Sequence, residues 1–591
     1  MSKSNINQEY RQKLQKNVKE NATLIWNIAD ILRGTYKPHE YGNVIIPFTV
    51  LRRFDCVLEK TKEAVLEADS KHKPSPLKEE FLKEASGYPF YNTSNYTFKK
   101  LVSDPNNIVS NFKDYLNGFS ENIREILDHF ELENQIGRLE GKNQKKKTKI
   151  KKLLYPIIKE FEKKDLHIEA ISNIEMGYIF EEIIRKFSES HNADAGEFYT
   201  PREVIELMTN ILFLKDDDIL SKDDASASIY DPACGTGGML SASEEYIKAL
   251  NQDAGILLYG QELNPMTWAI CQSDLMIKNN DTQSEQVVQG DTLTEDGFAN
   301  KTFNYILSNP PFGGKWSESK DEIEEEAKRG FEGRFGAGLP ATSDSQMLFL
   351  QHAISKMNPN SARVAIIHNG SPLFNGDAGS GESRIRQYIL EKDLLEAIIA
   401  LPNEIFYNTG IASYIWVLSN KKEQRRKGKV QLINANGLYE RRRKSLGQKR
   451  NDIPKSAIET ITKVYGDFVE NEISQIYDNS EFGYTQITVG RPKRDEKGKI
   501  IYKKGRPEAD SELCTTENIP FKEDIEEYFA REVLPYAPDA WIEEKKNKIG
   551  YEIPFTRYFY KYTPPTPSNE ILQEIQELEK QIVPLSKKVF G

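Results

Sequence analysis

Short runs rich in Val, Ile and Leu alternate with amphipathic segments between about residues 175 and 420, and this alternation constrains the fold more than any other feature. Seven runs predict strands, at residues 228–230, 257–261, 286–289, 303–307, 363–367, 395–400 and 413–418. Helical patterns at residues 265–278, 346–357 and 383–391 separate several of them. Such alternation predicts a doubly wound α/β sheet. In these sheets ligands bind beyond the carboxyl ends of the strands, so those ends are searched first for chemistry.

The regions that flank this middle part have a different character. Residues 1–173 predict a helical N-terminal domain, because apolar residues share one helical face at Leu24, Ile25, Ile28, Ile31 and Leu32. Residues 174–420 form the predicted catalytic domain. Residues 421–591 begin with a basic segment and continue as a C-terminal extension. Its last part predicts a short helix whose seam packs on this protein or on another subunit, with apolar residues at Ile571, Ile575, Leu578 and Ile582.

Composition limits the function classes. The 591 residues are 38% hydrophobic and 29% charged, and no apolar run approaches the roughly 18 residues that span a bilayer. Four widely spaced cysteines and seven scattered histidines predict a cytoplasmic protein with neither disulfides nor a metal site. A net charge of -10 argues against a surface that binds nucleic acid everywhere. Contact with DNA is therefore expected to be local or shared with a partner.

A glycine-rich turn follows the first predicted strand. Asp231-Pro232-Ala233-Cys234-Gly235-Thr236-Gly237-Gly238 precedes a helix that starts near Met239. Glycines allow a sharp turn and close approach to a ligand, and the N–H groups at a helix start face that ligand. A cofactor site and a purely structural turn both fit this motif alone. No phosphate-binding G-x-x-x-x-G-K-[ST] sequence is present.

Carboxylates follow the next two strands. Glu262 ends the second strand, where an acidic side chain accepts both ribose hydroxyls of a nucleoside cofactor such as NAD or S-adenosylmethionine. Asp291 follows the third strand, where it is suited to accept from an adenine amino group. Each residue alone is equally compatible with a helix cap.

The fourth strand ends in Ser308-Asn309-Pro310-Pro311-Phe312, and this motif decides between the cofactors. Consecutive prolines fix φ and lack N–H groups, so the turn presents carbonyl oxygens. Asn309 Oδ1 and the Pro310 carbonyl are each suited to accept one hydrogen of a planar amino group such as N6 of adenine. Phe312 offers a face for a base rotated out of the duplex. The motif predicts methyl transfer to an amino nitrogen.

A polar segment lies upstream of the first strand. Gly196-Glu197-Phe198-Tyr199-Thr200-Pro201-Arg202 precedes a predicted helix over residues 203–211 that begins at Pro201. Tyr199 and Thr200 are suited to hold the amino-acid end of the cofactor. The segment by itself is also an ordinary helix start.

Taken in order, these motifs resemble the modification subunit of type I restriction-modification systems, an N6-adenine DNA methyltransferase family. The resemblance rests on G-E-F-Y-T-P-R, D-P-A-C-G-T-G-G, Glu262, G-D-T-L, N-P-P-F, His368-Asn369-Gly370 and Leu401-Pro402-Asn403-Glu404-Ile405-Phe406, and covers about three quarters of the chain. Some related amino methyltransferases carry Asp where this chain has Asn309, and either residue accepts a hydrogen bond.

The resemblance implies a helical N-terminal domain, a seven-stranded methyltransferase sheet and S-adenosylmethionine as cofactor. It implies cofactor contacts from residues 197–202, residues 235–238, Glu262 and Asp291, with Asn309, Pro310 and Phe312 taking the adenine. The implied partners are double-stranded DNA and one specificity subunit for two copies of this chain, with the terminal helix packing on that subunit. Helicase motifs are absent, so cleavage is expected in a separate restriction/translocase subunit.

Three alternatives remain at this point. The chain is also compatible with methylation of a protein glutamine or an RNA guanine, with a stand-alone DNA enzyme, and with a catalytically silent scaffold subunit. Residues 142–152, with seven lysines, and residues 421–450, with twelve Lys or Arg against two Glu, are each either solvated surface or DNA contact. The charged insert at residues 315–345 either closes over DNA or is an ordinary surface loop.

Overall fold

The computed structural model describes residues 25–141, 151–172, 175–177, 179–180, 182–183, 200–278, 286–407, 409–503, 505–560 and 567–590. Residues 1–553 form one compact unit, and residues 554–591 form a second unit that is described by itself. Within the described residues, no helix combines the length and the apolar character that crossing a membrane requires.

The N-terminal region is helical, as predicted. Its helices are α2 (Gly42–Leu58), α3 (Lys62–Lys71), α4 (Pro76–Ser86), α5 (Phe98–Ser103), α6 (Ile108–Asn117), α7 (Glu121–His129), α8 (Leu132–Leu139) and α9 (Leu154–Glu162). Helix α2 is buried along almost its whole length because its side chains are mostly apolar. The buried Phe48 ring of α2 stacks on Phe112 of α6 and Phe161 of α9. These rings form the centre of the N-terminal core.

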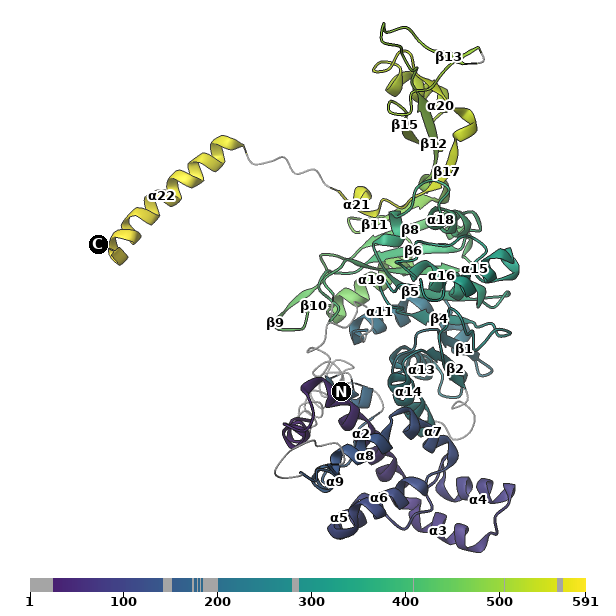
Figure 1. Ribbon diagram of the computed structural model, residues 1–591, viewed down its shortest axis with the longest axis vertical. Coiled ribbons are helices and arrows are strands. Elements are labelled where there is room, and N and C mark those ends of the chain that lie inside the picture. Colours follow the sequence, from purple (N-terminus) through teal and green to yellow (C-terminus); the bar gives the residue numbers. More distant parts are fainter. Residues whose placement is uncertain are drawn as a thin grey trace. The chain divides into compact units, whose positions relative to one another are not determined.

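The middle region contains the predicted α/β sheet (Figure 1). Its strands are β1 (Ser226–Asp231), β2 (Gly255–Glu262), β3 (Val287–Gln289), β4 (Tyr305–Ser308), β5 (Arg363–Asn369), β6 (Leu395–Ala400), β7 (Ser413–Ser419), β8 (Lys429–Asn434) and β11 (Ser474–Asp478). They lie in the order β11-β8-β6-β7-β5-β4-β1-β2-β3. All seven predicted strands are present.

The sheet has nine strands where seven were expected. Strand β8 pairs in parallel with β6, and β11 pairs antiparallel with β8, so the sheet continues past the boundary predicted at residue 420. The basic residues around β8 concealed its four buried central positions. Strand β7 runs antiparallel to both of its neighbours, β5 and β6. The segment between β6 and β7 therefore leaves and re-enters the sheet at the same edge.

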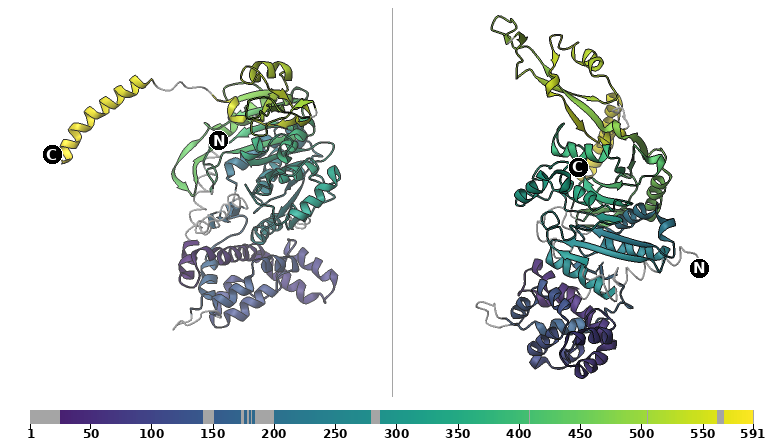
Figure 2. Two further views of the ribbon diagram at one scale, coloured as in Figure 1. Left: turned by 45° about the horizontal axis from the view of Figure 1, so that its top comes forward. Right: turned by 90° about the vertical axis from the view of Figure 1, so that its right-hand side faces the viewer.

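Helices cover both faces of the sheet (Figure 2). They are α11 (Arg202–Phe213), α12 (Asp217–Leu220), α13 (Gly238–Leu250), α14 (Pro265–Lys278), α15 (Lys320–Lys328), α16 (Gln346–Ser355), α17 (Ser371–Phe374), α18 (Gly381–Glu391) and α19 (Lys455–Asp467). Because side chains alternate along a strand, Ile229 of β1 joins the core with α11, α13 and α14, whereas Tyr230 bonds His352 of α16. Helix α14 also contacts α2 and α7, so the N-terminal helices pack on it.

The predicted insert at residues 315–345 is a packed element. Trp316 is buried, and α15 lies within the insert. Arg334 donates to the carbonyls of Thr292 and Leu293 at 2.6 and 2.7 Å, and forms an ion pair of 2.6 Å with Glu326. The insert is thus fixed to the chain that follows β3.

Beyond the sheet lie a two-stranded ribbon and a small antiparallel sheet. The ribbon consists of β9 (Glu440–Leu446) and β10 (Lys449–Asp452). The small sheet contains β12 (Gly483–Gly490), β15 (Thr515–Pro520), β16 (Trp541–Ile542) and β17 (Lys548–Tyr551), with β13 (Tyr502–Lys503), β14 (Arg506–Pro507) and α20 (Ile525–Tyr528) nearby in sequence. Its core includes Ile487, Val489 and Ile519.

The second unit contains α21 (Phe555–Tyr558) and α22 (Ser568–Phe590). Helix α22 confirms the terminal helix that the apolar spacing predicted, and it extends beyond the seam residues at both ends. The seam residues are exposed on it: Ile571, Ile575, Leu578 and Ile582.

Candidate active site

The site lies where β1, β2 and β4 end at one edge of the sheet. These strands are parallel, and Asp231 of β1 lies opposite Gly260 of β2. We call this the carboxyl edge. In the turn after β1, Gly235 and Gly237 have φ values of +55° and +80°, which side chains disfavour. A Cβ on Gly237 would lie 2.7 Å from Cys271 Sγ of α14, so glycine is also required sterically there. Helix α13 then begins at Gly238, as predicted within one residue.

Glu262 lies against this glycine turn. One carboxylate oxygen accepts the Gly235 N–H at 2.8 Å, and the other accepts the Asn264 N–H at 2.8 Å. Two backbone donors therefore fix the plane of the carboxylate. This geometry suits the predicted contact with ribose hydroxyls.

Asp231 links the glycine turn to the catalytic motif. Its Oδ1 accepts from the Ala233 N–H at 3.0 Å and from the Ser308 hydroxyl at 2.9 Å. The side chain is buried, and burial raises the pKa of Asp231 to about 7. Its bonds join the turn after β1 to the last residue of β4. The structure places it beneath the two motifs as a connection between them.

Asn309 has one satisfied and one unsatisfied polar atom. Its Nδ2 donates to Thr200 Oγ1 at 2.9 Å, which fixes the orientation of the amide. Its Oδ1 is buried and has no hydrogen-bond partner among the described residues. A buried acceptor without a partner costs about 1–3 kcal/mol, so this oxygen is suited to accept from a ligand donor. This atom is the predicted acceptor for an amino group.

The residues after Asn309 are held against the segment that follows β6. Pro310 is buried and Pro311 is partly buried. The Phe312 ring is 6% exposed and meets the Phe406 ring edge-on, with centroids 5.8 Å apart. Phe406 belongs to the Leu401–Phe406 motif, so the structure brings together two motifs that are distant in sequence. Stacking of a base on Phe312 stays a prediction.

Thr200, Pro201 and Arg202 lie at the start of α11. Pro201 is the N-cap, and the helix begins at Arg202, one residue later than predicted. The Arg202 guanidinium lies so close to Gly238 that a Cβ there would be 3.4 Å from it. Its charge also acts on the buried Asp274 of α14. Its predicted cofactor contact stays untested, and Glu197, Phe198 and Tyr199 lie outside the described residues.

Asp291 lies in a loop that several side chains fix. Its Oδ1 accepts the Leu293 N–H at 2.9 Å, which closes a local turn. The buried Gln261 donates to the Glu295 carbonyl at 2.7 Å and accepts the Gly297 N–H at 3.2 Å. Arg334 holds the same loop from the insert. Sequence reasoning missed Arg334, because nothing distinguishes it from the other charged residues of that segment.

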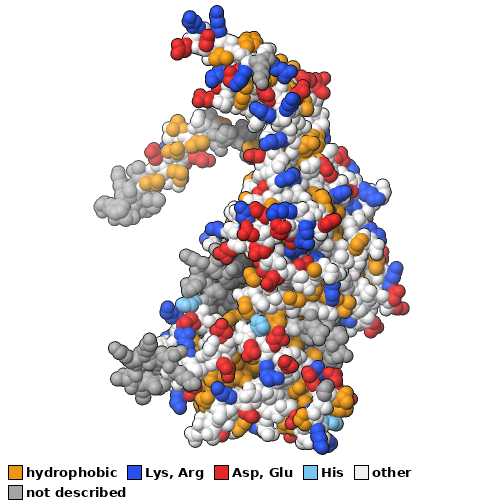
Figure 3. Space-filling model, turned by 45° about the vertical axis from the view of Figure 1, so that its right-hand side comes forward, with side chains coloured by type: hydrophobic (Ala, Val, Ile, Leu, Met, Phe, Trp, Pro, Cys, Tyr) orange, Lys and Arg blue, Asp and Glu red, His pale blue; other side chains and the backbone are white. Residues whose placement is uncertain are grey.

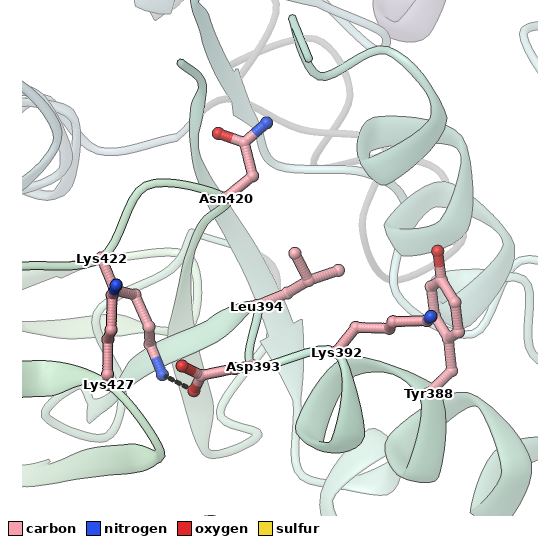
Figure 4. A pocket seen from close by; sticks show the side chains of 7 residues that line it. All are labelled: Tyr388, Lys392, Asp393, Leu394, Asn420, Lys422 and Lys427. Atoms are coloured by element: carbon pink, nitrogen blue, oxygen red, sulfur yellow. Dashed lines mark hydrogen bonds and ion pairs between the residues drawn. The ribbon is translucent and has the colours of Figure 1, made fainter. Parts of the chain in front are cut away.

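A pocket lies at the opposite end of the strands from the carboxyl edge, which we call the opposite edge (Figure 4). It is lined by Tyr388, Lys392, Asp393, Leu394, Asn420, Lys422 and Lys427. These residues precede β6, follow β7 or precede β8. Asp393 there pairs with the buried Lys422 at 2.5 Å. Its polar groups are thus used within the fold, and the carboxyl edge remains the candidate site.

Comparison with known proteins agrees with this assignment. A family model described as N-6 DNA Methylase matches residues 172–485, which are 314 of the 591 residues. The chain belongs to the N-6 DNA methylase family. A second model, described as the HsdM N-terminal domain, matches residues 21–161.

Relatives of this N-6 DNA methylase carry related descriptions. It is 26% identical over 464 residues to the type I restriction enzyme MjaIX methylase subunit of Methanocaldococcus jannaschii, covering 76% of this chain and 77% of that protein. It is 24% identical to the MpnII methylase subunit of Mycoplasma pneumoniae, covering 71% of this chain and 80% of that protein.

A solved structure supports the fold. The type I methyltransferase subunit from Streptococcus thermophilus aligns with a TM-score of 0.62 and 23% identity, covering 79% of this chain and 96% of that one. The predicted family, an adenine-specific DNA methyltransferase of type I systems, is confirmed by the two family models and these relatives. The roles of individual site residues stay predictions.

Proposed function

We propose that this N-6 DNA methylase transfers a methyl group from S-adenosylmethionine to N6 of adenine in double-stranded DNA, as the modification subunit of a type I restriction-modification complex. The observation that carries the proposal is the buried Asn309 Oδ1 that has no partner among the described residues, beside the glycine turn that Glu262 contacts. An amino hydrogen is a donor that such an oxygen accepts.

The residues present fit the cofactor. The turn at Gly235 and Gly237 suits close approach of a ligand, and two backbone N–H groups hold the Glu262 carboxylate beside this turn in a position suited to ribose hydroxyls. Asp291 lies in the loop after β3, where it is suited to the cofactor's adenine. S-adenosylmethionine, when bound, supplies an electrophilic methyl group on a sulfonium centre.

Asn309 performs the orienting step. With its Nδ2 bound to Thr200, its Oδ1 faces a substrate donor in one orientation only. Accepting a hydrogen bond at N6 draws the nitrogen lone pair out of the adenine ring, and the Pro310 carbonyl is suited to accept the second hydrogen. The nitrogen becomes nucleophilic through position and hydrogen bonding. After the N–C bond forms and the C–S bond breaks, one N6 proton leaves to solvent.

The assembly is part of the same proposal. The exposed apolar seam of α22 offers a surface for a second helix, which the specificity subunit supplies to two copies of this chain. The specificity subunit selects the DNA sequence, and a separate restriction/translocase subunit cleaves. The proposed partners of the chain are therefore double-stranded DNA, the specificity subunit and the restriction/translocase subunit.

The test is transfer of a labelled methyl group from S-adenosylmethionine to mixed-sequence duplex DNA. The full chain is assayed with and without the specificity subunit encoded beside it, together with Asn309→Ala. We expect N6-labelled adenine that requires the partner and is lost in Asn309→Ala. Labelling by the chain alone identifies a stand-alone enzyme. Labelling of RNA or protein instead of DNA, or of nothing, rejects the proposal.

A further inference from the structure

The β9–β10 ribbon contains the basic run Arg441-Arg442-Arg443-Lys444, and its pairing is irregular. Leu446 pairs with Lys449, and Arg441 pairs with Asn451. Residues 442–445 of β9 therefore lie opposite the single residue 450 of β10. Such a bulge turns side chains outward and prevents further strand pairing. The ribbon is visible beside the sheet in Figure 1.

The ribbon is anchored to both segments that contact the catalytic motif. Lys449, whose side chain is 2% exposed, pairs with Glu203 in the first turn of α11, three residues after Thr200. Backbone N–H groups of Gln448 and Arg450 donate to the carbonyls of Tyr407 and Glu404 at 2.7 and 2.9 Å.

Each anchoring segment also contacts the active-site motif directly. Thr200 accepts from Asn309, and Phe406, which lies between Glu404 and Tyr407, packs on Phe312. Strand β10 is thus joined to both segments that contact the catalytic motif, and β9 pairs with β10.

Three basic side chains of β9 are not used within the fold. Arg441, Arg443 and Lys444 are exposed and form no ion pair with any described residue. By contrast, Arg442 pairs with Asp452 at 2.6 Å. Positive and negative side chains are interspersed over the face shown in Figure 3. On β9, by contrast, Arg441, Arg443 and Lys444 lie within four consecutive residues and have no acidic side chain paired with them among the described residues.

We propose that Arg441, Arg443 and Lys444 bind backbone phosphates of the duplex that flanks the target adenine. This inference rests on the proposed function, because a base rotated into the site brings its neighbouring phosphates close to the segments to which the ribbon is anchored. Cationic side chains on an extended ribbon match the repeated charge of a DNA strand. Phosphate contacts position the duplex and carry no sequence information, which agrees with sequence selection by a separate subunit.

The test measures the salt dependence of DNA binding. A fluorescein-labelled mixed-sequence duplex is titrated between 50 and 200 mM KCl with the full chain, alone and combined with its specificity subunit. Each phosphate contact contributes about 0.9 to the slope of log affinity against log salt. The triple variant R441A/R443A/K444A is expected to bind more weakly, with a slope shallower by roughly 2 to 3.

A matched control removes the same charge at the opposite edge of the sheet. Lys392, Lys421 and Lys427 are exposed and precede β6, follow β7 and precede β8. The K392A/K421A/K427A variant should keep the wild-type slope. The R441K/R443K variant keeps both charges and should also retain it. Thermal unfolding confirms that each variant is folded.

The outcomes separate this inference from the proposed function. Equal slopes for the ribbon variant and wild type, equal losses in the ribbon and control variants, or no DNA binding by either wild-type sample overturn the ribbon assignment. Loss of the specificity subunit instead of the salt slope overturns it in favour of a protein interface. Methyl transfer is read separately, so unlabelled adenine in wild type rejects the proposed function independently.

Discussion

At the carboxyl edge of the sheet, Asn309 keeps a buried oxygen without a partner among the described residues, whereas at the opposite edge Asp393 uses both of its oxygens within the protein. One oxygen of Asp393 accepts from Lys422 and Asn479, and the other accepts from the Gly428 N–H at 2.9 Å. Both edges contain charged side chains, and the described pocket lies at the opposite edge. The difference teaches that a pocket alone does not identify a reactive edge, because the polar groups of Asp393 serve the fold.

The largest effect is expected at Asn309. Asn309→Ala removes the acceptor for N6 and should lower the methyl-transfer rate by roughly 10²- to 10³-fold, the usual loss for one preorganised polar contact. Asn309→Asp retains an acceptor and should keep more activity. Rates are measured with both substrates saturating. The unfolding temperature of Asn309→Ala is measured as a control. If the variant lost activity only because it unfolds, the assignment of Asn309 to the reactive edge would be contradicted.

The next effect concerns pH. Burial raises the pKa of Asp231 to about 7, so the folded protein binds this proton more tightly than the unfolded chain. Its contribution to stability is present at low pH and is lost as pH rises to about 7, with an upper limit of roughly 4 kcal/mol. Asp231→Asn does not ionise, so its stability relative to wild type should increase between pH 4 and pH 7. Unfolding free energies of the variant and of wild type are measured at each pH. If their difference stayed constant from pH 4 to pH 7, the prediction would be wrong.

Asp393 supplies the counterpart at the opposite edge. Asp393→Ala leaves the buried Lys422 without its carboxylate and should destabilise the fold by about 3 kcal/mol, as removal of one member of a buried pair does. Asp393 has φ +54°, which Asn tolerates better than Ala, so Asp393→Asn should cost less. Methyl transfer per folded molecule should not change. A reduced rate in these variants would show that the two edges are not independent.

The smallest effect is expected for Glu262→Gln. The amide retains one acceptor, so one of the two backbone N–H groups loses its bond, and the charge is removed. Affinity for S-adenosylmethionine should fall roughly ten- to hundredfold, which corresponds to a hydrogen bond to a charged group. Calorimetric titration measures this, with the exposed Asp253→Asn as a control. Unchanged affinity would remove Glu262 from the site.

The sequence predicted the central strands because they are buried on both faces and consist of continuous apolar runs. Strand β5, for example, is buried at every position. It did not predict β11, the outermost strand on one side of the sheet, in which only Ser474 is buried and the polar residues interrupt any apolar run. The Asn309 and Glu262 motifs were identifiable because special turns require particular residue types. Other contacts could not be predicted. Arg334, for example, holds the loop after β3 through tertiary contacts that leave no local sequence pattern.

The antiparallel direction of β7 has a consequence for how this family can diversify. Because β6 ends and β7 begins at the same edge, the connecting segment needs no crossover helix. Lengthening it between Thr409 and Ile411 would cost only about 0.6 kcal/mol for each doubling of its length. New DNA-facing surface can therefore be acquired by insertion at this position, while the strands that hold the methyl-transfer site keep their register.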